Sequence, residues 1–172
     1  AGDITTTNDL ISFATAATLT GDLSMTAGSG GVTFSSTLEG TGAGTEDLSL
    51  SAAGGTITLS GALGATTRLG DLTFASAATV NTGAITASSI IQQAGTGTTT
   101  FGGALNTNDA AAIGIDLTGT NFTFNGAVTT TGVGTVEVTN SGTLTTAAAA
   151  DMSLAGTFTQ NGAGSNSLAG DI

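Results

Sequence analysis

The chain has 172 residues and a formal net charge of −11, because twelve acidic residues stand against one basic residue, Arg68. Nucleic acids and anionic membrane surfaces bind through clustered lysine and arginine, so this charge argues against both as partners. No apolar run approaches the roughly 20 residues of a membrane-spanning helix, which argues against insertion into a membrane.

The residue inventory also argues against an enzyme. General acid–base and nucleophilic catalysis draw mainly on His, Cys, Lys, Tyr or a tuned pair of carboxylates, and of these only carboxylates occur in the chain. We therefore expect no catalytic and no cofactor-binding residues. A polysaccharide-active enzyme stays open as the weakest hypothesis, although the chain has no Trp or Tyr to stack on a sugar.

One unit recurs along the whole chain. Residues 22–38 and 47–63 align without a gap, and their large apolar residues fall at the same five positions: Leu23 and Leu48, Met25 and Leu50, Val32 and Ile57, Phe34 and Leu59, Leu38 and Leu63. The same template places units, in chain order, at 3–19, 22–38, 47–63, 71–85, 89–105, 112–128, 135–149 and from Asp151, with a ninth starting at Asp171. The mean period is about 21 residues, within the range of solenoids.

The apolar pairs within each unit have period two, which is typical of a strand with one buried side. Glycine-rich joints at 29–31 and 53–55 separate the pairs and predict turns. Short strands of this kind become stable by stacking coil on coil, at about 4.8 Å per coil. The sequence predicts an all-β fold, a right-handed parallel β-helix of about eight coils, as a single domain spanning residues 1–172.

The tetrapeptide Ala-Gly-Asp-Ile stands at residues 1–4 and again at 169–172. Two interpretations stay open. It marks a 168-residue super-repeat in a longer chain or a stack of subunits, or it is a coincidence in a chain rich in Ala and Gly. We expect the segment to be one part of a longer repetitive chain or fibre.

The aspartates that open many units are the best candidates for chemistry. If successive coils are in register, Asp22, Asp47 and Asp71 form a column, with Glu46 beside Asp47. Carboxylates this close would gather a cation, and Ca²⁺ prefers oxygen ligands. Alternatively, each Asp caps a turn. We favour capping, because the glycine-rich nonapeptide of calcium-binding β-rolls is missing.

Threonine runs stand at 5–7, 98–100 and 129–131. A flat threonine array that orders water would need the same outward pair on every coil. The runs fall at different positions within their units, so we expect them to reflect β-propensity on a solvated surface.

The units resemble the repeat regions of large bacterial surface proteins, the filamentous-haemagglutinin-like and autotransporter-type adhesins. The resemblance is carried by the [DE]-L-[ST]-L openings, by segments such as G-T-I-T-L-S-G-A-L at 55–63, and by the scarcity of Lys, Pro and Cys. It implies export, an extracellular or cell-surface location, and a structural or adhesive role. The first hypothesis is a rigid acidic rod whose partner is itself, through coil stacking. The second is a module that binds a host or environmental glycan or protein, with or without Ca²⁺, through variable linkers, above all residues 39–46.

Overall fold

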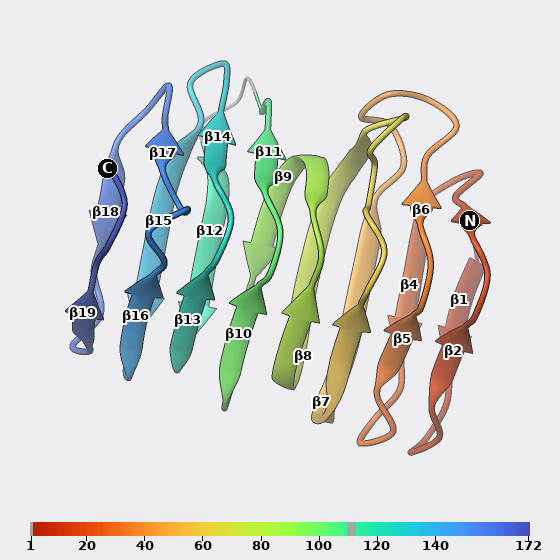
Figure 1. The fold of residues 1–172 in the computed structure, drawn as a ribbon. Coiled ribbons are helices and arrows are strands. Elements are labelled where there is room, and N and C mark those ends of the chain that lie inside the picture. Colours follow the sequence, from red (N-terminus) through yellow and green to blue (C-terminus); the bar gives the residue numbers. More distant parts are fainter. Residues whose placement is uncertain (1, 110–112) are drawn as a thin grey trace.

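A computed structural model describes residues 2–109 and 113–172 of the chain. These residues form 19 β-strands, and every pairing between them is parallel (Figure 1). The strands stack into a β-solenoid of about seven turns, close to the eight coils expected, which confirms the predicted fold class. The part of the chain that the structure describes has no helix with the length and apolar character needed to cross a membrane.

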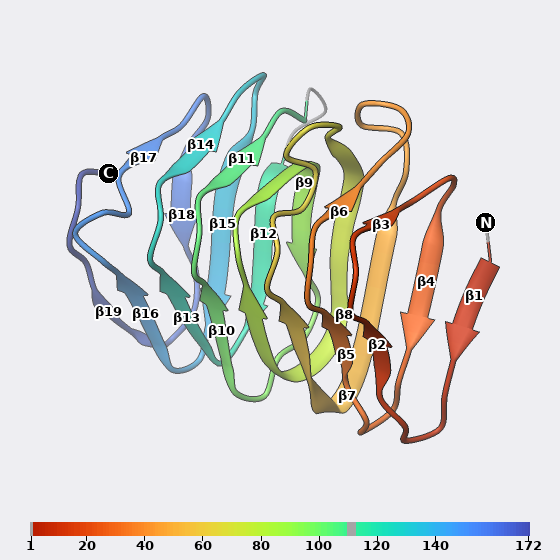
Figure 2. The same ribbon diagram turned by 45° about the vertical axis from the view of Figure 1, so that its right-hand side comes forward.

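Each turn of the solenoid has three faces, and Figure 2 shows the first of them behind the other two. The first face comprises β1 (Gly2–Thr5), β4 (Leu23–Thr26), the start of β7 (Leu48–Leu59), the middle of β8 (Leu69–Thr82), the end of β9 (Ile85–Gln92), β12 (Ile113–Gly119), β15 (Thr135–Asn140) and β18 (Phe158–Gln160). The second face comprises β2 (Ile11–Phe13), β5 (Val32–Phe34), the ends of β7 and β8, β10 (Thr98–Phe101), β13 (Asn121–Phe124), β16 (Thr143–Thr146) and β19 (Ser165–Ser167). The third face comprises β3 (Ala17–Thr18), β6 (Leu38–Glu39), Leu63, the start of β9, β11 (Leu105–Thr107), β14 (Val128–Thr130) and β17 (Met152–Ser153).

The length of a turn varies, because the linkers between faces absorb extra residues. Leu72 pairs with Ile90, 18 residues further on, whereas Leu23 pairs with Leu48, 25 residues further on. The apolar pairs predicted for 22–38 and 47–63 lie side by side as expected, Met25 beside Leu50 for example. Strand register, rather than a fixed period, therefore defines the coil.

The inward side chains form one continuous core. In β10, β13 and β16 of the second face the burial pattern alternates, so that Phe122 and Phe124 are buried while the residues between and before them are partly exposed. Phe101 stacks on Phe124 with ring centroids 5.2 Å apart, and Phe13 stacks on Phe34 at 4.7 Å. Each fully buried side chain of this size contributes roughly 1.5–3 kcal/mol, so the core holds the rungs in register.

Glycine is required at the corner between the second and third faces. A Cβ at Gly103 would lie 2.4 Å from the backbone nitrogen of Ala84, and a Cβ at Gly126 would lie 2.5 Å from the carbonyl carbon of Gly103. Backbones of successive coils stack directly at this corner. This explains the glycine in the G-T-I-T-L-S-G-A-L segment, where Gly61 faces Ser36 in the same way.

Two predicted units are displaced. In the first, Ile4 lies beside Met25 and not beside Leu23, so the predicted alignment of 3–19 is wrong by two residues and Asp3 lies beside Ser24. In the last, Met152 lies beside Val128 on the third face, and Phe158 takes the first position of the first face. Apolar pairs with the same spacing occur on all three faces, so spacing alone did not distinguish them.

The unit predicted at 112–128 begins outside the described residues, and its first apolar pair is also displaced. Ile115, rather than Ile113, pairs with Ile90, and the ladder to β15 is irregular between Ile113 and Ile115. Phe122, Phe124 and Val128 lie where predicted.

The two Ala-Gly-Asp-Ile segments occupy different positions in the coil. Ile4 lies on the first face beside Met25. In contrast, the N–H of Met152 donates to the carbonyl of Asp171 at 2.8 Å, which places the end of the chain along the third face. The four-residue match therefore does not reflect a structural repeat of 168 residues.

Candidate functional site

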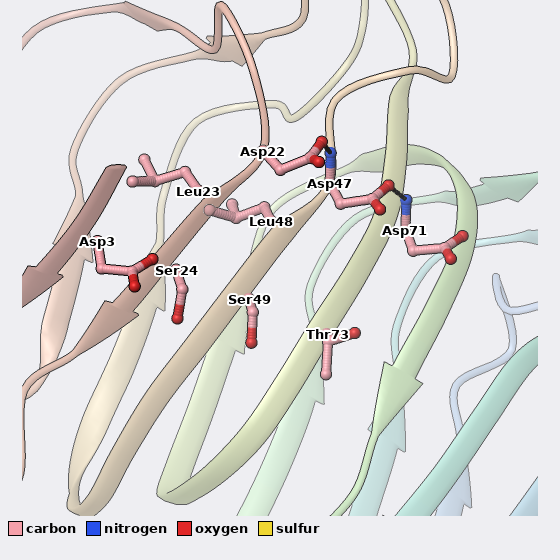
Figure 3. A pocket seen from close by; sticks show the side chains of 9 residues that line it. All are labelled: Asp3, Asp22, Leu23, Ser24, Asp47, Leu48, Ser49, Asp71 and Thr73. Carbon is pink, nitrogen blue, oxygen red and sulfur yellow. Dashed lines mark hydrogen bonds between the residues drawn. The ribbon is translucent and has the colours of Figure 1, made fainter. Parts of the chain in front are cut away.

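The predicted aspartate column exists at the corner that precedes the first face (Figure 3). Asp22, Asp47 and Asp71 follow one another on successive coils, and all three are exposed. The N–H of Asp47 donates to Oδ1 of Asp22 at 3.0 Å, and the N–H of Asp71 donates to Oδ1 of Asp47 at 2.7 Å. The hydroxyl of Ser89 donates to Oδ1 of Asp71 at 2.8 Å. Each carboxylate therefore accepts a hydrogen bond from the next coil.

The column acts as a set of caps between coils. A backbone N–H at a corner lies beyond the regular ladder and needs an acceptor, which the aspartate of the preceding coil supplies. This supports the capping interpretation, with the difference that Asp22 and Asp47 cap the backbone of the next coil rather than their own, while Asp71 accepts from the side chain of Ser89. Asp151 makes the same bond to the N–H of Asp171, at 3.0 Å, but at the corner before the third face. The aspartates of the sequence template thus serve two different corners.

A groove of about 350 Å³ runs beside the column on the first face. Its floor carries the outward row Asp3, Ser24, Ser49 and Thr73 (Figure 3). Within residues 2–109 and 113–172, no three acidic side chains gather closely enough to hold a metal ion. A calcium ion would have to draw on hydroxyls, backbone carbonyls and water, and its binding by Asp22, Asp47 or Asp71 stays the less favoured alternative to capping.

Glu46, the fourth candidate ligand, points away from the column. It is buried, with 6% of its surface exposed. Its carboxylate accepts a hydrogen bond from the hydroxyl of Thr41 and two contacts of 3.0 and 3.1 Å from the N–H of Gly42. The bond from Thr41, followed by that from Gly42, holds the pKa of Glu46 below its ordinary value of 4.5, against the opposing effect of burial. Glu46 therefore fixes the 40–46 linker.

The other charges near this linker are also used within the molecule. The carboxylate of Glu39 accepts hydrogen bonds from the N–H groups of Thr66 and Thr67, at 3.0 and 2.9 Å. Arg68 is half-buried, and its guanidinium donates to the carbonyl oxygens of Ala87 and Asn106 and to Oδ1 of Asn106. The sequence identified residues 39–46 as a variable and acidic linker, but did not indicate that Glu39 and the neighbouring Arg68 bond to other coils.

The sequence analysis did not predict a pair of acidic residues on the first face. Asp116 and Glu137 are direct partners on neighbouring rungs of the first face, in the outward row. Parallel rungs lie about 4.8 Å apart, so two like charges stand side by side on a half-exposed surface. Each of the two acidic residues follows a buried residue, Ile115 or Val136, and this alternation could have predicted that both point outward.

The second face carries a threonine-rich array that was also missed. The contiguous threonine runs at 5–7, 98–100 and 129–131 lie on different faces. They are not wholly on a solvated surface as expected, because Thr99 and Thr130 point inward and are buried. However, alternate residues from the third coil onward form two aligned outward rows. The first row is Thr56, Thr79, Thr98, Asn121, Thr143 and Ser165. The second row is Thr58, Asn81, Thr100, Thr123, Thr145 and Ser167. We call these twelve residues the threonine face.

Comparison with known proteins found no family model, no curated protein and no solved structure that matches the chain.

Proposed function

We propose that this chain is a structural segment of an extracellular or cell-surface fibre or adhesin, in which it forms a rigid acidic rod. The observation that carries the proposal is the continuity of the solenoid. Parallel ladders and the inward core link each coil to the next, and the aspartate caps add bonds between the coils of Asp22, Asp47 and Asp71. In such a stack every added coil contributes its own stability and one further interface with its neighbour.

The mechanism of a rod of this kind is mechanical. Load along the axis is shared among the rungs of three faces, so no single hydrogen bond carries it. The charge of −11 keeps neighbouring rods apart and soluble. The one site at which trypsin could cleave, after Arg68, is held by hydrogen bonds to two other coils. The contacts between coils support two parts of the proposal, resistance to proteases and stacking of one copy of the chain on another.

The 40–46 linker favours a second candidate function, binding of a glycan or protein by an adhesin module. Glu46 fixes the linker from inside, and the N–H of Gly44 donates to the carbonyl of Arg68 at 2.9 Å. Thr41, Ala43 and Thr45 remain exposed on a preorganised loop. A preorganised loop loses little entropy on binding.

Immunogold electron microscopy of intact cells tests the proposal. An antibody raised against residues 1–172 should label fibres outside unpermeabilised cells. The labelled fibres should have strands perpendicular to the fibre axis and a repeat of about 4.8 Å along it. Label confined to permeabilised cells, or to compact particles with no axial strand repeat, would contradict it. A glycan array with a Thr41→Ala, Thr45→Ala variant then tests the second candidate, which predicts loss of any bound glycan.

A further inference from the structure

We propose that the threonine face binds the surface of ice. The proposal is independent of the fibre function and rests on the regular arrangement of outward groups on the second face. Along a strand, alternate residues such as Thr98 and Thr100 are about 6.6 Å apart, and successive rungs are about 4.8 Å apart. The strands of the second face from β7 to β19 run side by side in Figure 1, so their outward positions form a two-dimensional array.

The backbone register makes this lattice regular. Thr56 and Thr58 pair directly with Thr79 and Asn81, and the pairing continues through Thr100 to the later rungs. The irregularities between β7 and β8 lie before Thr56, outside the array. A lattice of hydrogen-bonding groups can match the repeating oxygen positions of an ice surface only if its own spacing is constant over several rungs.

The hydroxyls of the array are free to bond water. Among the described residues, no protein group bonds the side-chain oxygen of Thr58, Thr100, Thr123 or Thr145. Each threonine offers one donor and two acceptor sites, while its methyl group restricts the orientation of neighbouring water. Three of the six rungs carry a threonine at both outward positions, at 56 and 58, 98 and 100, and 143 and 145. The other three rungs contain Asn81, Asn121, or the pair Ser165 and Ser167. The Oδ1 of Asn121 accepts the N–H of Thr143 at 2.8 Å, so this side chain points along the stack.

Charge provides a second, independent observation. The chain carries twelve acidic residues and one arginine, yet neither outward row of the threonine face contains a charged residue. The outward row of the first face, by contrast, carries Asp3, Asp116 and Glu137. Charged groups bind water strongly in their own hydration geometry, which is incompatible with an ice lattice. The threonine face also lacks aromatic side chains in both rows, so it does not suit a flat polysaccharide.

The face is held rigid from inside. Beneath it lie Phe101, Phe122 and Phe124, each fully buried. The rungs from β7 to β16 are hydrogen-bonded on both sides, whereas β19 pairs with β16 alone among the described strands. The hydroxyls therefore keep their spacing without an entropic cost of ordering. This preorganisation is what a surface must have to hold a layer of water in a fixed lattice.

The test compares the full chain with two charge-matched double variants in ice recrystallisation and crystal-shaping assays. Thr100→Lys with Thr123→Lys disrupts the threonine face, whereas Ser49→Lys with Thr73→Lys adds the same charge on the first face. We expect the wild-type chain and the first-face variant to inhibit recrystallisation and facet growing crystals, and the threonine-face variant to lose both effects. A Thr100→Ser, Thr123→Ser variant, which keeps the hydroxyls and removes two methyls, should show a partial loss.

Absence of any effect of the wild-type chain on ice would overturn the proposal, whatever the folding of the variants. Equal activity of the two lysine variants would overturn it as well, because the effect would then not come from this face. Sedimentation of the wild-type chain distinguishes a third outcome. Self-association that the threonine-face substitutions abolish, without an effect on ice, would assign the face to a second copy of the chain and refute ice binding.

Discussion

A buried polar pair in the core gives the sharpest test of the packing. Gln92 occupies an inward position of the first face between Phe74 and Leu117, and only 2% of its surface is exposed. The hydroxyl of Thr99, also 2% exposed, donates to Oε1 of Gln92 at 2.7 Å. The amide of Gln92 has one further contact, of 3.4 Å, to the carbonyl of Thr118. The Thr99 hydroxyl and the Gln92 amide oxygen are thus each other's hydrogen-bond partner inside the core.

The perturbation is a double-mutant cycle of Thr99→Val and Gln92→Leu. Either single change leaves a buried polar atom without a partner, which costs about 1–3 kcal/mol, and gains roughly 1 kcal/mol from the added apolar surface. Each single variant should therefore lose about 1 kcal/mol. The double variant removes both polar groups and should be as stable as the wild type or more so, which gives a coupling free energy of about 2 kcal/mol.

Urea unfolding of the four proteins, followed by circular dichroism, measures the cycle. Thr107 offers a matched control, because its hydroxyl is fully buried and has no hydrogen-bond partner among the described residues. Thr107→Val should stabilise the chain by about 1 kcal/mol, the opposite sign to Thr99→Val. Additive losses for Thr99→Val and Gln92→Leu would refute the reasoning, since they would show that water, and not the partner, satisfies each group.

Further predictions concern the corners. Gly103→Ala should destabilise the chain by at least 2 kcal/mol in the same urea assay, because the new Cβ would meet the Ala84 nitrogen at 2.4 Å; an unchanged midpoint would show that the coils can separate there. Asp47→Ala should lose about 1 kcal/mol and Asp47→Asn much less, because the amide oxygen can still accept the N–H of the next coil; equal losses would refute the capping role. The lowered pKa of Glu46 means that its stabilisation is complete above pH 4.5 and is lost as the pH falls below that value. The difference in melting temperature between wild type and Glu46→Gln should therefore shrink on acidification, and a constant difference from pH 7 to pH 3 would contradict this. Finally, millimolar Ca²⁺ should leave the melting temperature unchanged relative to Mg²⁺, because the carboxylates are already engaged; a shift of several degrees that Asp47→Asn abolishes would instead establish a calcium site.

The sequence predicted the fold because the fold depends on the feature that sequence shows most directly. Alternation of apolar and small polar residues fixes which side chains turn inward, and two gapless copies fix the register of their coils. The pairing of Met25 with Leu50 in the structure follows this predicted register. The last unit was misplaced, because Met152-x-Leu154 has the same spacing on the third face as Leu48-x-Leu50 has on the first.

The functional surface was harder to predict, since it depends on what register brings together from distant segments. Asp22, Asp47 and Asp71 were correctly aligned. The N–H and hydroxyl groups that donate hydrogen bonds to them are placed by corner geometry that no local pattern encodes. Contiguous threonine runs were a misleading signal for an array. The informative pattern was Thr-x-Thr at 56–58, 98–100 and 143–145, with a buried residue between the two threonines.

The central claim is the in-register stack of coils, and a single distance tests it most directly. The chain has no cysteine, so spin labels can be placed at Thr33→Cys and Thr145→Cys without background. These residues lie in one outward row of the second face, five rungs apart through Thr58, Asn81, Thr100 and Thr123. Pulsed electron paramagnetic resonance should give a narrow distribution centred near 24 Å, five steps of about 4.8 Å. A broad distribution, or a centre displaced by more than two rungs, would contradict the solenoid.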